Sequence, residues 1–159
     1  MFSSESEISE ANKVSKILLL RRQLYQEKIE DFFETIKSIY ASTPYTLSSK
    51  ADEGYFHSLF YLMMCASGIE AYNEVLTSNG RIDLLVEFAD KVYIIEFKCN
   101  QSADMGIKQI RERKYYERYL KEDSPHGITT ARQVKCIYLI GINFSTDEKN
   151  IMEWKLEKM

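Results

Sequence analysis

The spacing of apolar positions divides the chain into helical and extended stretches. Residues 5–40 contain neither Gly nor Pro, and their apolar residues recur at three- and four-residue intervals. This pattern predicts one long helix or two shorter ones. Pro44 ends the region, because proline disfavours helical geometry in the residue before it. Residues 51–68 form a second, strongly apolar helical stretch that Gly68 closes.

The pattern changes to that of strands near residue 70. Three runs rich in β-branched and aromatic residues follow one another, and short turn sequences separate them. An Asn-Gly pair between two such runs is a strong hairpin signal, so the segment predicts an antiparallel meander. The three strands are expected at about residues 71–77, 81–88 and 92–98.

The rest of the chain alternates once more between the two patterns. Residues 103–121 return to helical spacing, and residues 134–144 have the continuous apolar character of a buried strand. The tail from residue 150 fits a strand or a helix equally well. The order of elements therefore predicts an α+β fold with an αβββαβ core, in which helices flank a mixed sheet. Residues 1–45 are expected to form an N-terminal helical extension, and residues 46–159 the domain itself.

Three charged residues interrupt the apolar strands, namely Asp83, Glu96 and Lys98. Burying a charge without a partner costs several kcal/mol or more, so their placement needs an explanation. A two-residue turn at Ala89-Asp90 pairs Phe88 with Lys91, and the same register places Asp83 opposite Glu96, with Cβ atoms about 5 Å apart. Glu96 and Lys98 share a face because residues two apart in a strand point the same way.

The same register assigns further residues to the two faces of the hairpin. Arg81 falls opposite Lys98, and an Asn79-Gly80 turn would pair Ser78 with Arg81. Glu74 would then lie on the charged face, diagonal to Asp83. The opposite face is expected to be core and consists of Ile82, Leu84, Val86, Phe88, Tyr93, Ile95 and Phe97.

Carboxylates held this close repel one another unless a proton or a cation lies between them. A divalent cation that prefers hard oxygen ligands, such as Mg²⁺, suits the Asp83–Glu96 pair. Lys98 beside the cation could orient a water molecule. A cation and an oriented water are the groups that metal-assisted hydrolysis of a phosphodiester needs. The alternative that stays open is a plain surface ion pair between Glu96 and Lys98.

Composition limits the remaining classes of function. The net charge is −3, so binding to nucleic acid would have to come from a local patch. No apolar run approaches the roughly 20 residues of a membrane span, and the acidic, polar N-terminus does not resemble a signal peptide. An odd number of widely spaced cysteines favours reduced thiols and a cytoplasmic location, with Cys65 and Cys136 expected in the core.

A local basic patch is present in residues 108–121, which contain six basic residues and two acidic ones. Arg111, Lys114 and Arg118, followed by Lys121, recur at three- and four-residue steps and predict one helical stripe that could bind phosphates. An ordinary solvated helix face is the alternative. His57 is interpreted as a core histidine, and neither His57 nor His126 has the partners of a zinc site.

Five stretches in this order resemble a known family: "EGYFHSLFYLMM", "NEVLTSNGRIDLLVEF", "YIIEFK", "KQIRERKYYERY" and "YLIGINF". Over about residues 30–156 the chain resembles the PD-(D/E)XK nuclease superfamily, which has a restriction-endonuclease-like fold. The likeness is greatest to nuclease-like domains that lie C-terminal to AAA-type ATPase-like modules in bacterial proteins. Here "ID" stands in place of the family's "PD", and the chain contains no Gly-x-x-x-x-Gly-Lys phosphate loop.

The resemblance implies roles for individual residues. Asp83 and Glu96 become ligands of Mg²⁺ or Mn²⁺, with the Phe97 carbonyl as a third oxygen, and Lys98 positions the attacking water. Glu53 matches an acidic helix position of the superfamily, although a charge that favours the helix N-terminus is an equal explanation. Gln109 is the expected substrate contact, together with the basic residues Arg111, Lys114 and Arg118.

Two hypotheses of function follow. The first is a Mg²⁺-dependent nuclease domain, spanning residues 46–159, that acts on nucleic acid, with DNA as the expected substrate. The second is a nuclease-fold module that binds nucleic acid or a protein partner without cutting it. Residues 1–45 could connect to an ATPase module of the natural protein or could assemble a homo-oligomer, and no membrane partner is expected.

Overall fold

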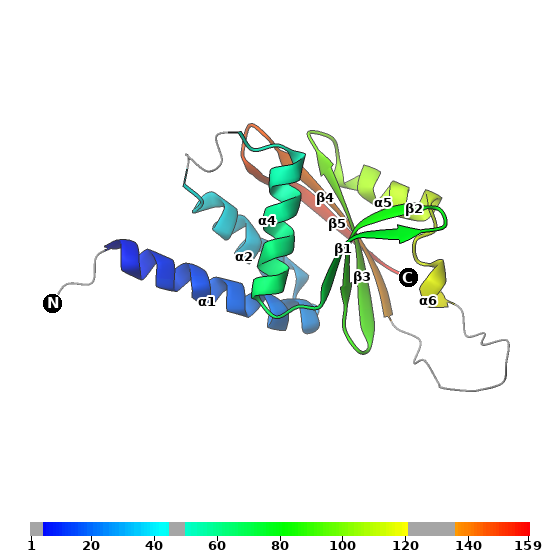
Figure 1. The fold of residues 1–159 in the computed structure, drawn as a ribbon, viewed down its shortest axis with the longest axis horizontal. Helices are drawn as coiled ribbons and strands as arrows, with labels where there is room; N and C mark the ends of the chain where they lie inside the picture. The colour runs from blue at the N-terminus through cyan, green and yellow to red at the C-terminus, as the bar shows by residue number, and fades with distance from the viewer. Residues whose placement is uncertain (1–4, 45–49, 121–135) are drawn as a thin grey trace.

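The computed structural model describes residues 5–44, 50–120 and 136–159. These residues form five helices and five strands, labelled as in Figure 1, where the label α3 is not used. The helices are α1 (Glu5–Tyr25), α2 (Ile29–Ala41), α4 (Glu53–Ala66), α5 (Ala103–Glu112) and α6 (Glu117–Leu120). The strands are β1 (Ala71–Thr77), β2 (Gly80–Glu87), β3 (Lys91–Cys99), β4 (Cys136–Ser145) and β5 (Asn150–Lys158).

The strands form a single five-stranded sheet with the order β1-β2-β3-β4-β5. Strands β1, β2 and β3 form an antiparallel meander, β3 and β4 run parallel, and β4 pairs with β5 antiparallel. Helix α5 lies in the connection between the parallel strands, as such a crossover requires. The predicted α+β class, meander and mixed sheet are therefore confirmed, and the undecided tail is a strand.

The sheet separates two hydrophobic clusters. Helices α1, α2 and α4 cover one face and α5 covers the other (Figure 1). The larger cluster joins those three helices to side chains such as Leu84, Val86 and Ile95, whereas the smaller one packs α5 against Leu85 and Ile94. Because β2 and β3 are buried on both faces, a charged side chain within them must be satisfied by partners inside the protein.

The N-terminal region consists of two helices, and their core residues belong to the same large cluster as the sheet. A turn with Glu27 at φ 60° separates them. Strand β3 holds the end of α1, because the Lys91 ammonium donates to the Tyr25 carbonyl at 2.7 Å and the Tyr93 hydroxyl donates to the Leu24 carbonyl at 2.7 Å. These bonds satisfy carbonyls at the end of the helix. The domain boundary between residues 45 and 46 stays a prediction.

The register of β2 and β3 is the predicted one, with Leu84 opposite Ile95, but the register of β1 and β2 is not. Arg81 pairs with Leu76 rather than with Ser78, because Ser78-Asn79 forms the turn and Thr77 pairs with Gly80. The expected pairing through an Asn79-Gly80 turn is therefore wrong.

The faces of this hairpin also differ from the prediction. Ile82 packs in the smaller cluster with Leu85, although it was expected on the face of Leu84. The alternation changes at the position where Glu74 of β1 has a φ of 51° and breaks the regular pleat. A local break of this kind reverses the faces of the residues beyond it.

Helix α5 ends earlier than predicted, so the basic residues do not form one continuous helical stripe. Lys114 has a φ of 51°, and its N–H donates to the Arg111 carbonyl at 3.2 Å. The next N–H, of Tyr115, donates to the Ile110 carbonyl at 3.3 Å. These two bonds form a Schellman motif, which ends the helix and turns Tyr115 into the smaller cluster beside Ile110. A lysine instead of a glycine in the left-handed position concealed this end from sequence patterns.

Several other expectations concern the surface. Cys65 and Cys136 are exposed, so their expected burial is wrong. Cys65 lies on the outer side of α4, and Cys136 begins β4 at an exposed end of the strand. Lys121 and His126 lie outside the described residues. Among the residues that the structure describes, no helix has the length and apolar character needed to cross a membrane.

Two glycines allow α5 to lie unusually close to the sheet. A Cβ atom on Gly106 of α5 would come within 2.9 Å of the Gly141 Cα atom and 3.1 Å of the Glu96 carbonyl oxygen. A Cβ atom on Gly141 of β4 would collide with the Ala103 carbonyl oxygen. The absence of side chains at both positions therefore sets the distance from α5 to β3 and β4.

We expect Gly141→Ala to destabilise the protein by about 1–3 kcal/mol or more, because the backbone of α5 must move to accept the methyl group. Urea unfolding measures this change. Gly54→Ala is the matched control, since a Cβ atom at Gly54 makes ordinary contact with Asp52 and lies within α4. It should leave the stability unchanged or raise it by about 0.5–1 kcal/mol. Equal stability of both variants would contradict the close packing of α5.

Candidate active site

The Asp83 and Glu96 carboxylates meet where β2 and β3 stop pairing through their backbones. The ladder between these strands ends at Leu84 and Ile95. Beyond it, the Asp83 N–H donates to Glu96 Oε1 at 3.2 Å, and the Phe97 N–H donates to Asp83 Oδ2 at 2.9 Å. The structure thus brings Asp83 and Glu96 together, as their register predicts. Beyond the last backbone pair, their carboxylates accept the hydrogen bonds that strand carbonyls would otherwise accept.

Gln109 of α5 joins Glu96 to Lys98. Its Nε2 donates to Glu96 Oε2 at 2.8 Å, and its Oε1 accepts a hydrogen bond from Lys98 Nζ at 2.6 Å. Glu96 and Lys98 therefore point to the same face, as predicted. Gln109 lies three residues after Gly106, so the close approach of α5 described above brings the amide within reach of both side chains.

Glu96 is the most deeply buried carboxylate of the site and has no exposed surface. Burial disfavours its charged form and, together with the neighbouring Asp83 carboxylate, raises the pKa of Glu96 to about 9. The hydrogen bond from the Asp83 N–H and the Lys98 ammonium act in the opposite direction, but their effect is smaller. Without a cation, Glu96 therefore holds a proton at neutral pH.

The donor set of this site fits a hard divalent cation. Asp83 and Glu96 supply carboxylate oxygens, and Mg²⁺ binds through one or two carboxylates while it keeps several waters. A bound cation would take the place of the proton that the raised pKa of Glu96 favours. Within residues 5–44, 50–120 and 136–159, no group of three or more His, Cys, Asp or Glu side chains could hold a metal ion. Water, substrate or backbone oxygens would have to complete the coordination.

Two residues that the sequence patterns did not place at the site contact it. His57 Nε2 lies 3.2 Å from the Asp83 carbonyl oxygen, although His57 was interpreted as a core histidine. The buried Tyr115 forms a side-chain hydrogen bond with Gln109 and donates its hydroxyl to the Arg81 carbonyl at 2.9 Å. Contacts between residues so distant in the chain leave no periodic signal. The position of His57 on the same helix as the acidic candidate Glu53 is the one feature that could have suggested it.

Two acidic candidates do not join the carboxylate pair. Glu53 is exposed at the start of α4, where its charge contributes to raising the pKa of the Cys99 thiol, after the larger effect of burial. Glu74 was expected near Asp83, but its carboxylate forms an ion pair with Arg81 at 3.2 Å on the exposed surface. The left-handed backbone of Glu74 explains this difference, because it breaks the alternation on which the expectation rested.

The basic residues expected to contact substrate have protein partners on the surface. Arg111 forms an ion pair with Glu157, and Lys114 lies 3.8 Å from a Glu117 carboxylate oxygen. The Arg118 guanidinium lies over the Tyr119 ring, 5.4 Å from its centroid. Arg111 lies in α5, Lys114 in the turn after it and Arg118 in α6, so they do not form one helical stripe.

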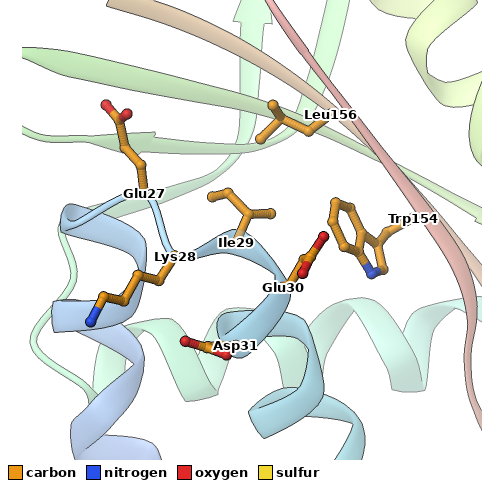
Figure 2. A pocket seen from close by; sticks show the side chains of 7 residues that line it. All are labelled: Glu27, Lys28, Ile29, Glu30, Asp31, Trp154 and Leu156. Carbon is orange, nitrogen blue, oxygen red and sulfur yellow. The ribbon is translucent and has the colours of Figure 1, made fainter.

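A separate groove of about 500 Å³ lies between the turn from α1 to α2 and strand β5. Its lining includes the apolar side chains of Ile29, Trp154 and Leu156 (Figure 2). The Glu27 and Asp31 carboxylates, which also line it, point away from one another, and Glu27 pairs with Lys91 at 3.1 Å. None of the candidate site residues lines this groove, and its carboxylates do not converge on one point.

Comparison with known proteins places the carboxylate pair within a region that matches a family model. A family model described as the PD-(D/E)XK nuclease superfamily matches residues 51–154, which include Asp83, Glu96 and Lys98. The uncharacterized protein in vnfD 5'region of Azotobacter chroococcum mcd 1 is 31% identical over 109 residues, or 67% of this chain. The chain spans 19% of that relative's length. No solved structure matches the chain.

The proton on Glu96 predicts a specific dependence of stability on pH. An acid whose pKa is about 9 when folded and 4.5 in its ordinary state stabilises the fold fully below about pH 4.5. This contribution is lost progressively as the pH rises toward 9, because the unfolded chain releases the proton first. Glu96→Gln mimics the protonated form, so the melting temperature of the variant should increasingly exceed that of the wild type between pH 5 and pH 8.5.

Thermal unfolding in the absence of divalent cations measures this difference, and about 2–4 °C corresponds to each kcal/mol in a chain of this size. Adding Mg²⁺ at pH 8 should raise the melting temperature of the wild type and leave that of Glu96→Gln unchanged. Parallel pH profiles for the two proteins would contradict the protonation of Glu96.

Proposed function

The chain belongs to the PD-(D/E)XK nuclease superfamily, and we propose that it hydrolyses phosphodiester bonds of nucleic acid with a divalent cation as cofactor. The observation that carries the proposal is the contact of the half-buried Asp83 with the fully buried Glu96 at the end of the β2–β3 ladder. Such a pair costs stability at neutral pH, and a cation offsets that cost. A purely structural site has no need of this arrangement.

We propose that Asp83 and Glu96 hold Mg²⁺ or Mn²⁺, with the Phe97 carbonyl oxygen as a third ligand. When bound, the cation would polarise the phosphate and favour deprotonation of a water molecule. Lys98 orients that water and offsets the negative charge that develops on the phosphate. Gln109 keeps the Lys98 ammonium beside Glu96 through its two hydrogen bonds. Glu53 supports the site from the start of α4 through water.

We propose DNA as the substrate, with Gln109 near the reacting phosphate and Arg111, Lys114 and Arg118 on the strand backbone. The ion pairs of Arg111 and Lys114 lie on the surface, where such pairs contribute at most about 1 kcal/mol, so a phosphate can displace them. From the family resemblance we also propose an ATPase module in the natural protein and a cytoplasmic location; the longer relative has room for such a module.

The second candidate function is binding of nucleic acid or of a protein partner without cleavage. One observation favours it: among the described residues, no third His, Cys, Asp or Glu side chain completes a metal-binding group with Asp83 and Glu96. A site with few ligands binds its cation weakly, and a weakly held cation could leave a nuclease fold that binds without cutting.

The test is a plasmid-cleavage assay with Mg²⁺ or Mn²⁺, combined with calorimetric titration of each metal. We expect cleavage by the wild type to require the metal and to stop when EDTA removes it. Asp83→Asn should abolish metal binding and lower cleavage by at least about 100-fold, because it removes one of the two carboxylates. Lys98→Ala should retain metal binding, and its cleavage should fall to a similar extent.

Glu34→Gln is the matched control, since Glu34 is an exposed carboxylate of α2 that pairs with Lys37. It should cut at the rate of the wild type. Metal binding without cleavage in the wild type would favour the second candidate function. No metal binding at millimolar concentration would overturn the nuclease proposal for this chain.

Binding to phosphates predicts how the affinity for DNA depends on salt. Replacing Arg111, Lys114 and Arg118 by Gln should lower the slope of log K against log salt by about 0.9 for each phosphate that the variant no longer neutralises. Fluorescence anisotropy with a short labelled duplex in EDTA measures binding without cleavage. The control replaces Arg21, Arg22 and Lys37, which lie on α1 and α2, and should leave the slope unchanged. Equal slopes for both triple variants would contradict the assignment of these phosphate-binding residues.

A further inference from the structure

His57 reaches the backbone of Asp83 from the face of the sheet opposite to α5. It lies on α4, and its Nε2 atom is 3.2 Å from the Asp83 carbonyl oxygen. A carbonyl oxygen can only accept a hydrogen bond, so Nε2 must carry the proton. The half-buried imidazole therefore donates to a residue 26 positions away, at the carboxylate pair.

The position of this imidazole is fixed by aromatic packing. The centroid of the His57 ring lies 4.7 Å from that of the Phe97 ring, and Phe60, one turn later on α4, lies 5.2 Å from the same ring. Phe56 and Phe60 have no exposed surface. Helix α4 thus presents His57 from a rigid surface, and a side chain that rests on packed neighbours loses little freedom when it makes a hydrogen bond.

The Asp83 backbone needs a side-chain donor because Asp83 is not paired with a neighbouring strand. The pairs of β2 with β1 continue on either side of Asp83 but do not include it, and the pairs of β2 with β3 end at Leu84. The Asp83 N–H donates to the Glu96 side chain, and its carbonyl oxygen accepts from His57. Buried backbone groups need partners, so these two side chains take the place of strand neighbours. With the backbone held in this way, the carboxylate turns toward the Phe97 N–H.

We propose that His57 is a positioning residue that holds the Asp83 backbone, and through it the Asp83 carboxylate, in the orientation needed at the candidate active site. The positioning of Asp83 by His57 is inferred from their hydrogen bond and from the bond of Asp83 to the Phe97 N–H. An effect of His57 on metal affinity rests in addition on the proposed function. Residues that orient ligands in this way commonly change metal affinity by about 10–100-fold when they are replaced.

The first test is amide hydrogen exchange, measured by NMR on the metal-free protein. The Phe97 amide is the reporter, because its N–H donates to Asp83 Oδ2. His57→Phe keeps an aromatic ring against Phe97 and removes the donor. We expect it to accelerate exchange of the Phe97 amide by at least about fivefold, as the removal of one hydrogen bond implies. His57→Gln, which retains an N–H donor, should restore at least part of the protection.

Two controls separate this effect from a general decrease in stability. The Ile94 amide lies in the regular part of the ladder opposite Leu85, and its exchange should not change in His57→Phe. Ser58→Ala alters the exposed neighbour of His57 on α4 and should leave both amides unchanged. His57→Ala is measured in parallel, so that the comparison survives if His57→Phe does not fold. Unchanged exchange at Phe97 in the folded variants, or equal acceleration at Ile94, would overturn the proposal.

The second test is calorimetric titration of the same proteins with Mn²⁺. We expect His57→Phe to weaken Mn²⁺ binding by about tenfold or more and His57→Gln to bind more tightly than His57→Phe. Unchanged affinity in His57→Phe would overturn the link to metal binding. If the wild type itself binds no Mn²⁺, the proposed function fails, but hydrogen exchange at Phe97 still decides whether His57 positions Asp83.

Discussion

The Glu96 carboxylate has no exposed surface, and it shares its surroundings with the carboxylate of Asp83. Two such groups cannot both be charged in a buried place without a compensating proton or cation. Burial and the Asp83 charge therefore raise the pKa of Glu96 to about 9 when no cation is bound. Much of the surrounding structure can be understood as the means by which β2, β3, α4 and α5 bring these two groups together and satisfy their remaining polar atoms.

The two faces of the sheet contribute different parts of the site. From one face, α5 reaches Glu96 and Lys98 through Gln109, and it can do so because Gly106 and Gly141 allow close packing. From the other face, α4 reaches the Asp83 backbone through His57. The end of the ladder between β2 and β3 opens the space in which these groups meet. The site therefore depends on tertiary packing from both layers rather than on one local motif.

The sequence was sufficient where the physics is local and periodic. Alternation and the two-residue turn after Phe88 placed Asp83 beside Glu96, because the register of a hairpin follows from its turn. The same reasoning failed for Glu74 and Ile82, because a left-handed residue breaks the alternation and leaves no mark in the pattern of apolar residues.

Long-range contacts and an unusual helix end account for what else the sequence could not predict. Lys114 ends α5 in a conformation that glycine usually adopts, so the helical spacing of the basic residues continued past the true end of the helix. His57 has the neighbours of a core residue, and its contact with Asp83 follows only from the approach of α4. Gln109 was placed near the site by family resemblance, and the structure adds the two bonds that define its position.

We propose above all that the Asp83–Glu96 pair binds a cation. A crystal of the protein soaked in millimolar Mn²⁺, with data collected at a wavelength where manganese scatters anomalously, tests this most directly. We expect one anomalous peak within bonding distance, about 2.0–2.3 Å, of oxygens from both Asp83 and Glu96. An absence of any peak there, with Glu96 still bonded to Gln109 and Asp83, would contradict it.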